Sequence, residues 1–114
     1  VIYMPRYVLK KSNRKGKKWV LIMPDENMKH HFGSSDYRDY TLMNDKNSKF
    51  YEPDEAERKR VRKRYRDRHR SDKGLGNRHS PAELAWSLLW SKPTLSESIK
   101  YYERKFGVHI INKT

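Results

Sequence analysis

The run ERKRVRKRYRDRHR, residues 57–70, constrains the fold of this chain more than any other stretch, because so many cations repel one another unless the segment is capped and docked. Asp54 stands before the run as a candidate N-cap, and Glu57 follows three residues later, which is the spacing of a capping box. Gly74 is a candidate left-handed stop at the other end. We therefore predict a long basic helix over residues 54–73.

A thin apolar seam runs along this predicted helix. Val61 and Tyr65 stand at i and i+4, so they can dock on a core while the arginines fan outward. Asp67 is the only acid between Arg58 and Arg70, whereas an ordinary solvated helical face interleaves acids with its bases. The run therefore indicates a surface for an acidic or phosphate-bearing partner. Its candidate residues are Arg58, Lys59, Arg62, Lys63, Arg66 and Arg70.

A second basic segment, KKSNRKGKK, covers residues 10–18. It lies between two strand-like runs, and its SNRKG centre is typical of a turn, so we expect a hairpin tip. Such a tip exposes cations together with backbone N–H groups, which suits phosphate oxygens or a cluster of carboxylates. A turn that is merely kept soluble by lysine is the alternative. The candidate residues here are Lys10, Lys11, Arg14, Lys15, Lys17 and Lys18.

The whole sequence predicts an α+β fold in a single domain, residues 1–114. Residues 7–41 contain three strand-like segments, RYVLKK, KKWVLIM and MKHHFGS, separated by the turns SNRKG and PDEN. This pattern predicts a small N-terminal antiparallel β-meander, packed against the basic helix and two short C-terminal helices. Residues 42–53 are polar and aperiodic, which indicates an irregular connection. Residues 108–114 form either a tail or an edge strand, through VHII.

Residues 80–107 predict a hairpin of two helices. The capping-box patterns SPAE (80–83) and TLSE (94–97) start the two helices, and Gly107 closes the second. Helical spacing also places Leu84 and Ala85 on the buried face of the first helix. The side chains that we expect to be mostly buried are Trp86, Leu88, Leu89, Leu95, Ile99, Tyr102 and Phe106. Either Val20 and Ile22 of the meander, or their alternate neighbours, should face them.

Composition favours binding over chemistry. The chain has 114 residues, with 27 Lys and Arg against 14 Asp and Glu, so its net charge is +13 and its pI is near 10.0. An excess of this size is usually matched by a polyanionic or acidic partner. The aromatic content of 12% argues against disorder, because chains that cannot form a core are poor in aromatic residues.

Several classes of function are disfavoured. The absence of cysteine excludes disulfides, cysteine-ligated zinc and thiol catalysis, and it fits a reducing compartment. The histidines share no ligand spacing, and we expect neither metal nor cofactor. No apolar run approaches the roughly 20 residues that span a bilayer, and no cleavable signal opens the chain. The segment RYVLKKSNRKGKKWVLIM faintly resembles the paired strands that open GIY-YIG nucleases, but neither signature tripeptide is present. We expect a non-enzymatic, soluble protein.

Four segments together resemble a family of small basic proteins of uncharacterised function from nucleo-cytoplasmic large DNA viruses, such as the mimivirus-like viruses. They are KKSNRKGKKW, HFGSSDYRDYT, RYRDRH and LLWSKPTLSESIKYYERKFG, and the similarity extends from Tyr7 to Gly107. The most specific pieces are Phe32-Gly33 with Asp39-Tyr40-Thr41, and the segment LLWSKPTL. The family has no assigned catalytic residues. The resemblance implies a product of a large double-stranded DNA virus, made in cytoplasmic factories of the host, with a place in the virion.

Residues and resemblance lead to two hypotheses. The first is a virion structural protein, a minor capsid or internal component, whose basic loop and helix dock on acidic surfaces of neighbouring major or minor capsid proteins. The second is a sequence-independent protein that binds double-stranded DNA and packages the genome through phosphate contacts.

Overall fold

A computed structural model describes residues 3–114, so residues 1 and 2 of the predicted domain lie outside the described residues. Its sheet has four strands: β1 (Arg6–Lys11), β2 (Lys17–Met23), β3 (Met28–Ser34) and β4 (His109–Asn112). The order is β3-β2-β1-β4, with β4 parallel to β1 and the other pairs antiparallel. The predicted meander is therefore confirmed, although it ends at Ser34 and not near Thr41. The predicted edge strand is also present.

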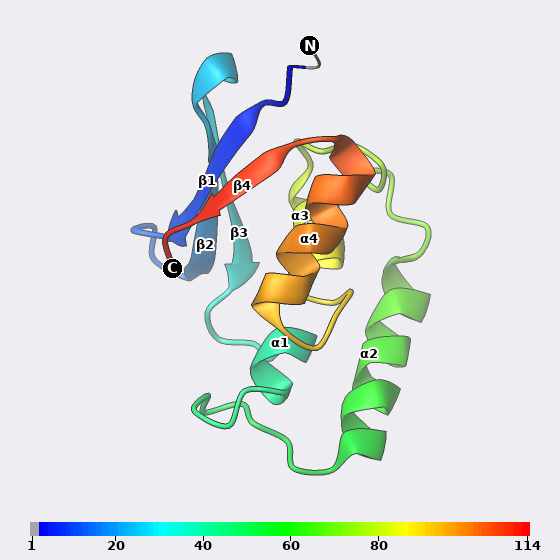
Figure 1. Cartoon of the computed structure of the whole chain (residues 1–114). Helices are drawn as coiled ribbons and strands as arrows, with labels where there is room; N and C mark the ends of the chain where they lie inside the picture. Colours follow the sequence, from blue (N-terminus) through cyan, green and yellow to red (C-terminus); the bar gives the residue numbers. More distant parts are fainter. Residues whose placement is uncertain (1–2) are drawn as a thin grey trace.

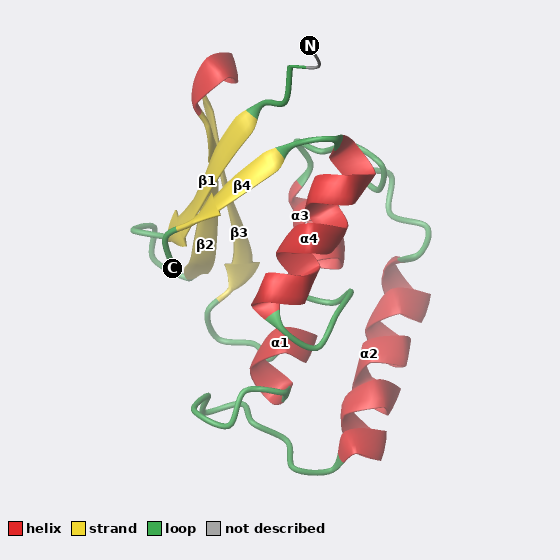
Figure 2. Cartoon of the chain, in the orientation of Figure 1, coloured by secondary structure: helices red, strands yellow, loops and turns green. Residues whose placement is uncertain are grey.

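Four α-helices lie on one side of this sheet (Figures 1 and 2): α1 (Tyr40–Met43), α2 (Glu55–His69), α3 (Pro81–Leu88) and α4 (Leu95–Phe106). The predicted α+β class is confirmed. α3 and α4 lie closest to the sheet, while α2 stands on the outer side of the helical layer and packs on α1. α1 begins inside the predicted meander and continues into the predicted irregular connection, because Asp39 accepts a hydrogen bond from the backbone N–H of Leu42 and so caps a single turn.

The short turns follow the local signals in the sequence. SNRKG closes the β1–β2 hairpin, and Gly16 there has a φ of +83°, a left-handed value that favours glycine. PDEN connects β2 to β3 through a 3-10 turn, η1 (Pro24–Glu26). Asn27 follows this turn with a φ of +52°, which asparagine tolerates better than most residues.

The core fills the space between the helices and one face of the sheet. The predicted residues Leu88, Leu89, Ile99 and Tyr102 are buried, while Leu95 and Phe106 are partly buried against the core. On β2 the alternate neighbours face inward, so Trp19, Leu21 and Met23 contact the core while Val20 and Ile22 lie on the opposite face.

Trp86 is partly buried, as the helical spacing predicts, but it lies outside the core cluster. Its ring is covered by the guanidinium of Arg66, whose carbon lies 4.1 Å from the ring centroid. Trp90 occupies the core in its place and stacks on Tyr65 with their ring centroids 4.1 Å apart. This stack, together with the buried Val61, confirms the predicted apolar seam of α2.

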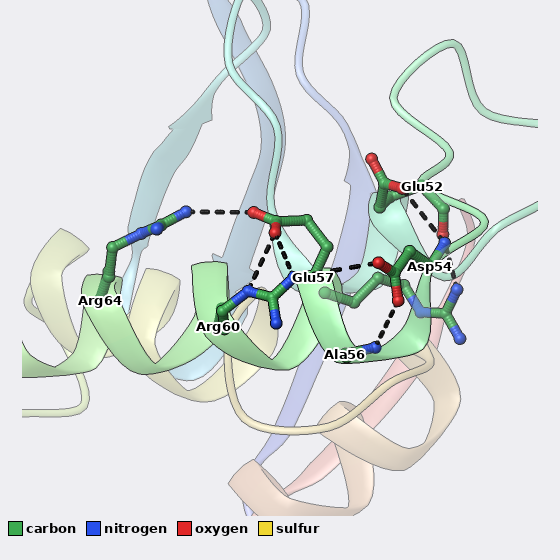
Figure 3. Close-up of polar contacts among 7 residues, drawn as sticks. Glu52, Asp54, Ala56, Glu57, Arg60 and Arg64 are labelled. Carbon is green, nitrogen blue, oxygen red and sulfur yellow. Dashed lines mark hydrogen bonds and ion pairs between the residues drawn. The ribbon is translucent and has the colours of Figure 1, made fainter.

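The start of α2 is capped differently from the prediction. Asp54 does cap the helix, because its Oδ1 accepts from the N–H of Ala56 at 3.0 Å. Glu57 does not reach back, and Glu52 accepts from the N–H of Asp54 at 3.1 Å instead. Figure 3 shows the carboxylate of Glu57 turned along the helix toward Arg60 and Arg64. The predicted capping box is therefore wrong in its second half, because the arginines one and two turns later bind the carboxylate more strongly than a neutral amide does.

The end of α2 also differs. The helix stops at His69, four residues before the predicted end at Lys73, and the left-handed glycine in this region is Gly76 and not Gly74. Gly74 serves a different purpose, since a Cβ there would collide with the side chain of Ser80. Ser80 is the N-cap of α3, so the missing side chain lets the loop pass close to the start of that helix.

Glu83 is the other capping residue that the structure corrects. It does not complete a capping box with Ser80; its carboxylate is fully buried and binds Lys105 of α4 at 3.0 Å. It also accepts from the N–H of Gly76 at 2.7 Å and from the hydroxyl of Ser87. A buried carboxylate needs such partners to offset its lost hydration, so Glu83 ties the loop after α2 to both C-terminal helices.

Candidate functional site

The predicted partner-binding cations lie on two separate surfaces. Those of residues 10–18 surround the β1–β2 hairpin at one end of the sheet, whereas those of α2 lie on the outer side of the helical layer (Figure 1). Apart from Lys18, whose side chain turns toward the helical layer, the basic loop and the basic helix therefore do not form one surface.

Three of the six α2 candidates turn inward. Arg62 donates from Nε to the carbonyl oxygen of Trp90 at 3.0 Å and from Nη2 to that of Ser91 at 2.8 Å, so it binds the segment that follows α3. Arg58 donates to the carbonyl oxygen of Glu52 at 2.6 Å. Arg66 lies over Trp86, and its burial lowers the pKa of its guanidinium, as does the nearby charge of Arg62. The prediction that these arginines fan outward is wrong, because polar backbone ends and an aromatic face of neighbouring elements lie within their reach.

The other three α2 candidates are exposed but paired along the helix. Lys59 lies 3.1 Å from Glu55, and Lys63 and Arg70 lie 2.7 and 3.0 Å from Asp67. Glu55, just before the run, and Asp67 within it thus supply acidic partners at helical spacing. Exposed pairs of this kind add little stability, yet they reduce the positive potential that the helix presents to a partner.

The hairpin keeps its cations free. We call Lys10, Lys11, Arg14, Lys15 and Lys17 the hairpin patch. All five side chains are exposed, and within residues 3–114 none forms an ion pair. This patch is where the exposed, uncompensated charge of the predicted site gathers.

Lys18 is the exception among the hairpin candidates. Its Nζ lies 2.6 Å from Oδ2 of Asp39, and the two side chains are 9% and 1% exposed. Asp39 also accepts from the hydroxyl of Thr41 at 2.5 Å. Lys18 therefore joins β2 to the cap of α1 and is not available to a partner, which corrects its predicted role.

Backbone hydrogen bonds hold the hairpin patch in place. Ser12 donates from its N–H to the carbonyl oxygen of Lys18 at 3.0 Å, and Lys17 donates to that of Arg14 at 3.2 Å. Ser35, which follows β3, donates to the carbonyl oxygen of Gly16 at 3.0 Å. These three hydrogen bonds order the backbone of the hairpin in the free chain. Binding a partner through its cations should therefore cost little additional backbone entropy.

The hairpin patch continues onto the uncovered face of the sheet. Alternation along the strands places Val8, Val20, Ile22 and Ile111 on this face, and the register aligns Val8 with both Ile22 and Ile111. A shallow groove of about 300 Å³ lies here, lined by Lys10, Lys11, Asn13, Val20, Ile22, Lys29 and His31. None of the four strands contains Asp or Glu, so the strands bring aliphatic side chains and cations to this face without any acid.

Lys29 and His31 extend the site beyond the predicted residues. His31 lies beside the hairpin, with Nδ1 2.7 Å from the hydroxyl of Ser12. Burial lowers the pKa of His31, and the charges of Arg14, Lys29 and Lys17 lower it further. The uncompensated positive field thus contributes to the depressed pKa. The sequence signal that could have placed Lys29 and His31 on this face is the PDEN turn. This turn pairs β3 with β2, so that Lys29 lies beside Ile22 and His31 beside Val20.

The described residues contain no group that suits a metal ion. Within residues 3–114, no three His, Cys, Asp or Glu side chains are arranged to hold one. The helices of the same region are all too short or too polar to cross a lipid bilayer. His30 and His79 do meet, with Nε2 and Nδ1 3.3 Å apart, and Glu26 lies 3.1 Å from His79.

Comparison with known proteins yields one match. Residues 7–52 match the model of a family of unknown function (DUF5754), which is less than half of the chain. The matched segment contains β1 to β3, α1 and the connection that follows, so it includes the whole hairpin patch and stops before α2. The match agrees with a resemblance to an uncharacterised family. Neither the curated proteins nor the solved structures provide a match.

Proposed function

We propose that this chain is a non-enzymatic docking protein that attaches to an acidic surface of a partner protein through the hairpin patch and the uncovered sheet face. The observation that carries the proposal is the set of five exposed cations without ion pairs within residues 3–114. They lie on a turn and on the two strands that it joins, and neither strand contains an acid. Unpaired charge on a rigid hairpin is an unfavourable arrangement in the isolated chain. Carboxylates of a partner would relieve it.

The apolar content of the same face supports a protein partner over nucleic acid. Val8, Ile22 and Ile111 are partly exposed and form an aliphatic strip beside the cations, as in interfaces with an apolar centre and a charged rim. Val20, on the same face, is buried beneath its neighbours. The strands bring no Phe, Tyr or Trp to this face for bases to stack on. Arg58, Arg62 and Arg66 turn inward, which reduces the number of cations that α2 could offer to a DNA backbone. Lys59, Lys63 and Arg70 are exposed but already paired with acids.

The resemblance to small basic proteins of large DNA viruses extends the proposal to a biological setting. In that setting the chain is a structural component of the virion, a minor capsid or internal protein, and its partners are capsid proteins of the same virus. Assembly would take place in cytoplasmic factories of the host cell. The match of residues 7–52 to an uncharacterised family supports the part of the resemblance that contains the hairpin patch.

Sequence-independent DNA binding is the second candidate, and one observation favours it. The exposed cations of the hairpin patch lie beside a backbone turn, which is also how proteins contact phosphate oxygens. If all five cations each neutralised one phosphate, log affinity would fall with log salt at a slope of roughly −4 to −5.

Titration against two polyanions separates the candidates. We expect poly-L-glutamate and a mixed-sequence DNA duplex, each followed by fluorescence anisotropy, to bind at low salt. At about 150 mM salt, where the Debye length is about 8 Å, binding to the duplex should be lost. Tight duplex binding at this salt, with the steep slope above and no sequence preference, would contradict the docking proposal and support genome packaging.

A further inference from the structure

A cavity of about 420 Å³ opens between α2, α3 and the segment that follows β3. It lies apart from the hairpin patch, and no residue of the patch lines it. Four cationic side chains line it: Lys18, Arg38, Arg64 and Arg68. Arg64 and Arg68 are one turn apart on α2, and neither was among the residues predicted to bind a partner.

The positive charge of this cavity is not balanced by the chain. Asp39 is the one acid in the lining, and Lys18 already neutralises it at 2.6 Å. Arg64 has a single contact with Glu57, from Nη2 at 3.3 Å, which leaves the rest of its guanidinium free. Among residues 3–114, Arg38 and Arg68 have no acidic partner. Three arginines therefore line one cavity with little acid to balance them.

The remainder of the lining is largely apolar. Val61, Ala85, Leu89 and Trp90 contribute to it, and Val61, Leu89 and Trp90 are buried. Tyr65 stacks on Trp90, and burial raises the pKa of the Tyr65 phenol to about 12, so its hydroxyl stays protonated at neutral pH. An apolar lining gives the organic part of a ligand a surface to pack on.

We infer that this cavity binds a small phosphate ester. A guanidinium group can form bidentate hydrogen bonds with the oxygens of a phosphate. Three arginines offer more donors than a single carboxylate, with two oxygens, can accept. The volume lies within the roughly 300–1,000 Å³ range of small-molecule pockets. Arg38, Arg64 and Arg68 hold the phosphate, and the organic group lies against Tyr65 and Ala85, which line the cavity and are only partly buried. The site is independent of the docking surface that the hairpin patch provides.

Calorimetry with phenyl phosphate tests this site. We expect it to bind with a dissociation constant below about 1 mM, and inorganic phosphate to bind more weakly because it lacks an apolar group. The double variant R64A/R68A should lose about tenfold or more in affinity. K59A/K63A removes the same charge from the outer side of α2 and should bind as the unaltered chain does. Arg38 lies outside the helices, and R38A should also lose affinity. R38A therefore replaces R64A/R68A in this test if the double variant does not fold.

Three results would overturn the inference. If phenyl phosphate gave no heat of binding at concentrations up to about 5 mM, the cavity would not be a phosphate site. If R64A/R68A, or R38A in its place, bound phenyl phosphate as tightly as the unaltered chain does, the anion would bind elsewhere. Equal affinity for inorganic phosphate and phenyl phosphate would show that the apolar lining makes no contact with an ester.

Discussion

Arg62 reaches from α2 to the carbonyl oxygen of Trp90, 3.0 Å from its Nε, and so belongs to the fold and not to a binding surface. A hydrogen bond to a charged group contributes about 1.5–3 kcal/mol. We expect R62A to lower the free energy of unfolding by about 2 kcal/mol in urea titrations. The neighbouring variant K63A, on the exposed side of α2, should change it by less than about 0.5 kcal/mol. Equal effects of the two changes would contradict this assignment.

The buried pair of Lys18 and Asp39 yields a second prediction. K18M removes the cation and leaves the carboxylate of Asp39 in an interior position, where it is 1% exposed. Removing one partner of a buried pair costs about 3–5 kcal/mol. We expect a loss near the lower end, about 3 kcal/mol, because Thr41 and the N–H of Leu42 still bind Asp39. K17M changes an exposed neighbour and is the control. If K17M lowered the free energy of unfolding as much as K18M does, the loss would come from disruption of the hairpin and not from the buried pair.

The local parts of this fold could be predicted from the sequence, and the long-range parts could not. SNRKG, PDEN, Ser80, Thr94 and Gly107 act on backbone within a few residues of themselves, so the turns and most helix ends follow from short patterns. The direction of Arg62, in contrast, depends on where the end of α3 lies, and that position is set by packing. Sequence spacing therefore located the basic helix but not its role.

The same distinction holds for the candidate site. The exposure of the hairpin cations could be predicted because a tight turn projects its side chains whatever the rest of the chain does. The loss of Lys18 could not, because Asp39 is brought to it only by the course of the chain after β3. The cluster of Arg38, Arg64 and Arg68 has the same origin, since α2 and the segment after β3 meet only in the folded chain.

Stability should fall between neutral and mildly acidic pH. Burial lowers the pKa of His30, and so does the nearby charge of His79; burial and nearby cations likewise lower the pKa of His31. Because both pKa values lie below the unfolded value of 6.5, the unfolded chain takes up more protons as pH falls below 6.5. The contribution of the two neutral histidines to the free energy of unfolding is complete above pH 6.5. It is lost as the pH falls through the lower pKa values that they have in the folded chain.

Urea midpoints at about pH 7.5 and about pH 5.5 check this prediction, since carboxylates with ordinary pKa values stay ionised in that window. The unaltered chain should unfold at lower urea at the acidic pH. The variant H30Q/H31Q should show a smaller difference between the two conditions. If the unaltered chain had the same midpoint at both pH values, the two histidines would not be coupled to folding in this direction.

His31 should also report on occupancy of the hairpin patch. Burial is the main reason for its low pKa, but the charges of Arg14, Lys29 and Lys17 add to it. A bound polyanion screens those charges while leaving His31 in place, so the pKa of His31 should rise when poly-L-glutamate is added. An NMR titration of the imidazole carbon resonances measures this shift, and His109 at the far end of the sheet provides the comparison. A pKa of His31 that does not move while poly-L-glutamate binds would place the polyanion elsewhere.

The hairpin patch, and not the arginine-rich helix, is the docking surface in the function that we propose. The variants R14Q/K15Q and K59Q/K63Q test this claim most directly, because each removes two positive charges from exposed side chains and leaves the same net charge. Their affinity for poly-L-glutamate should be measured by anisotropy at one salt concentration. We predict that R14Q/K15Q loses about tenfold in affinity and K59Q/K63Q less than about twofold. Equal losses, or a larger loss for the helix variant, would contradict the claim.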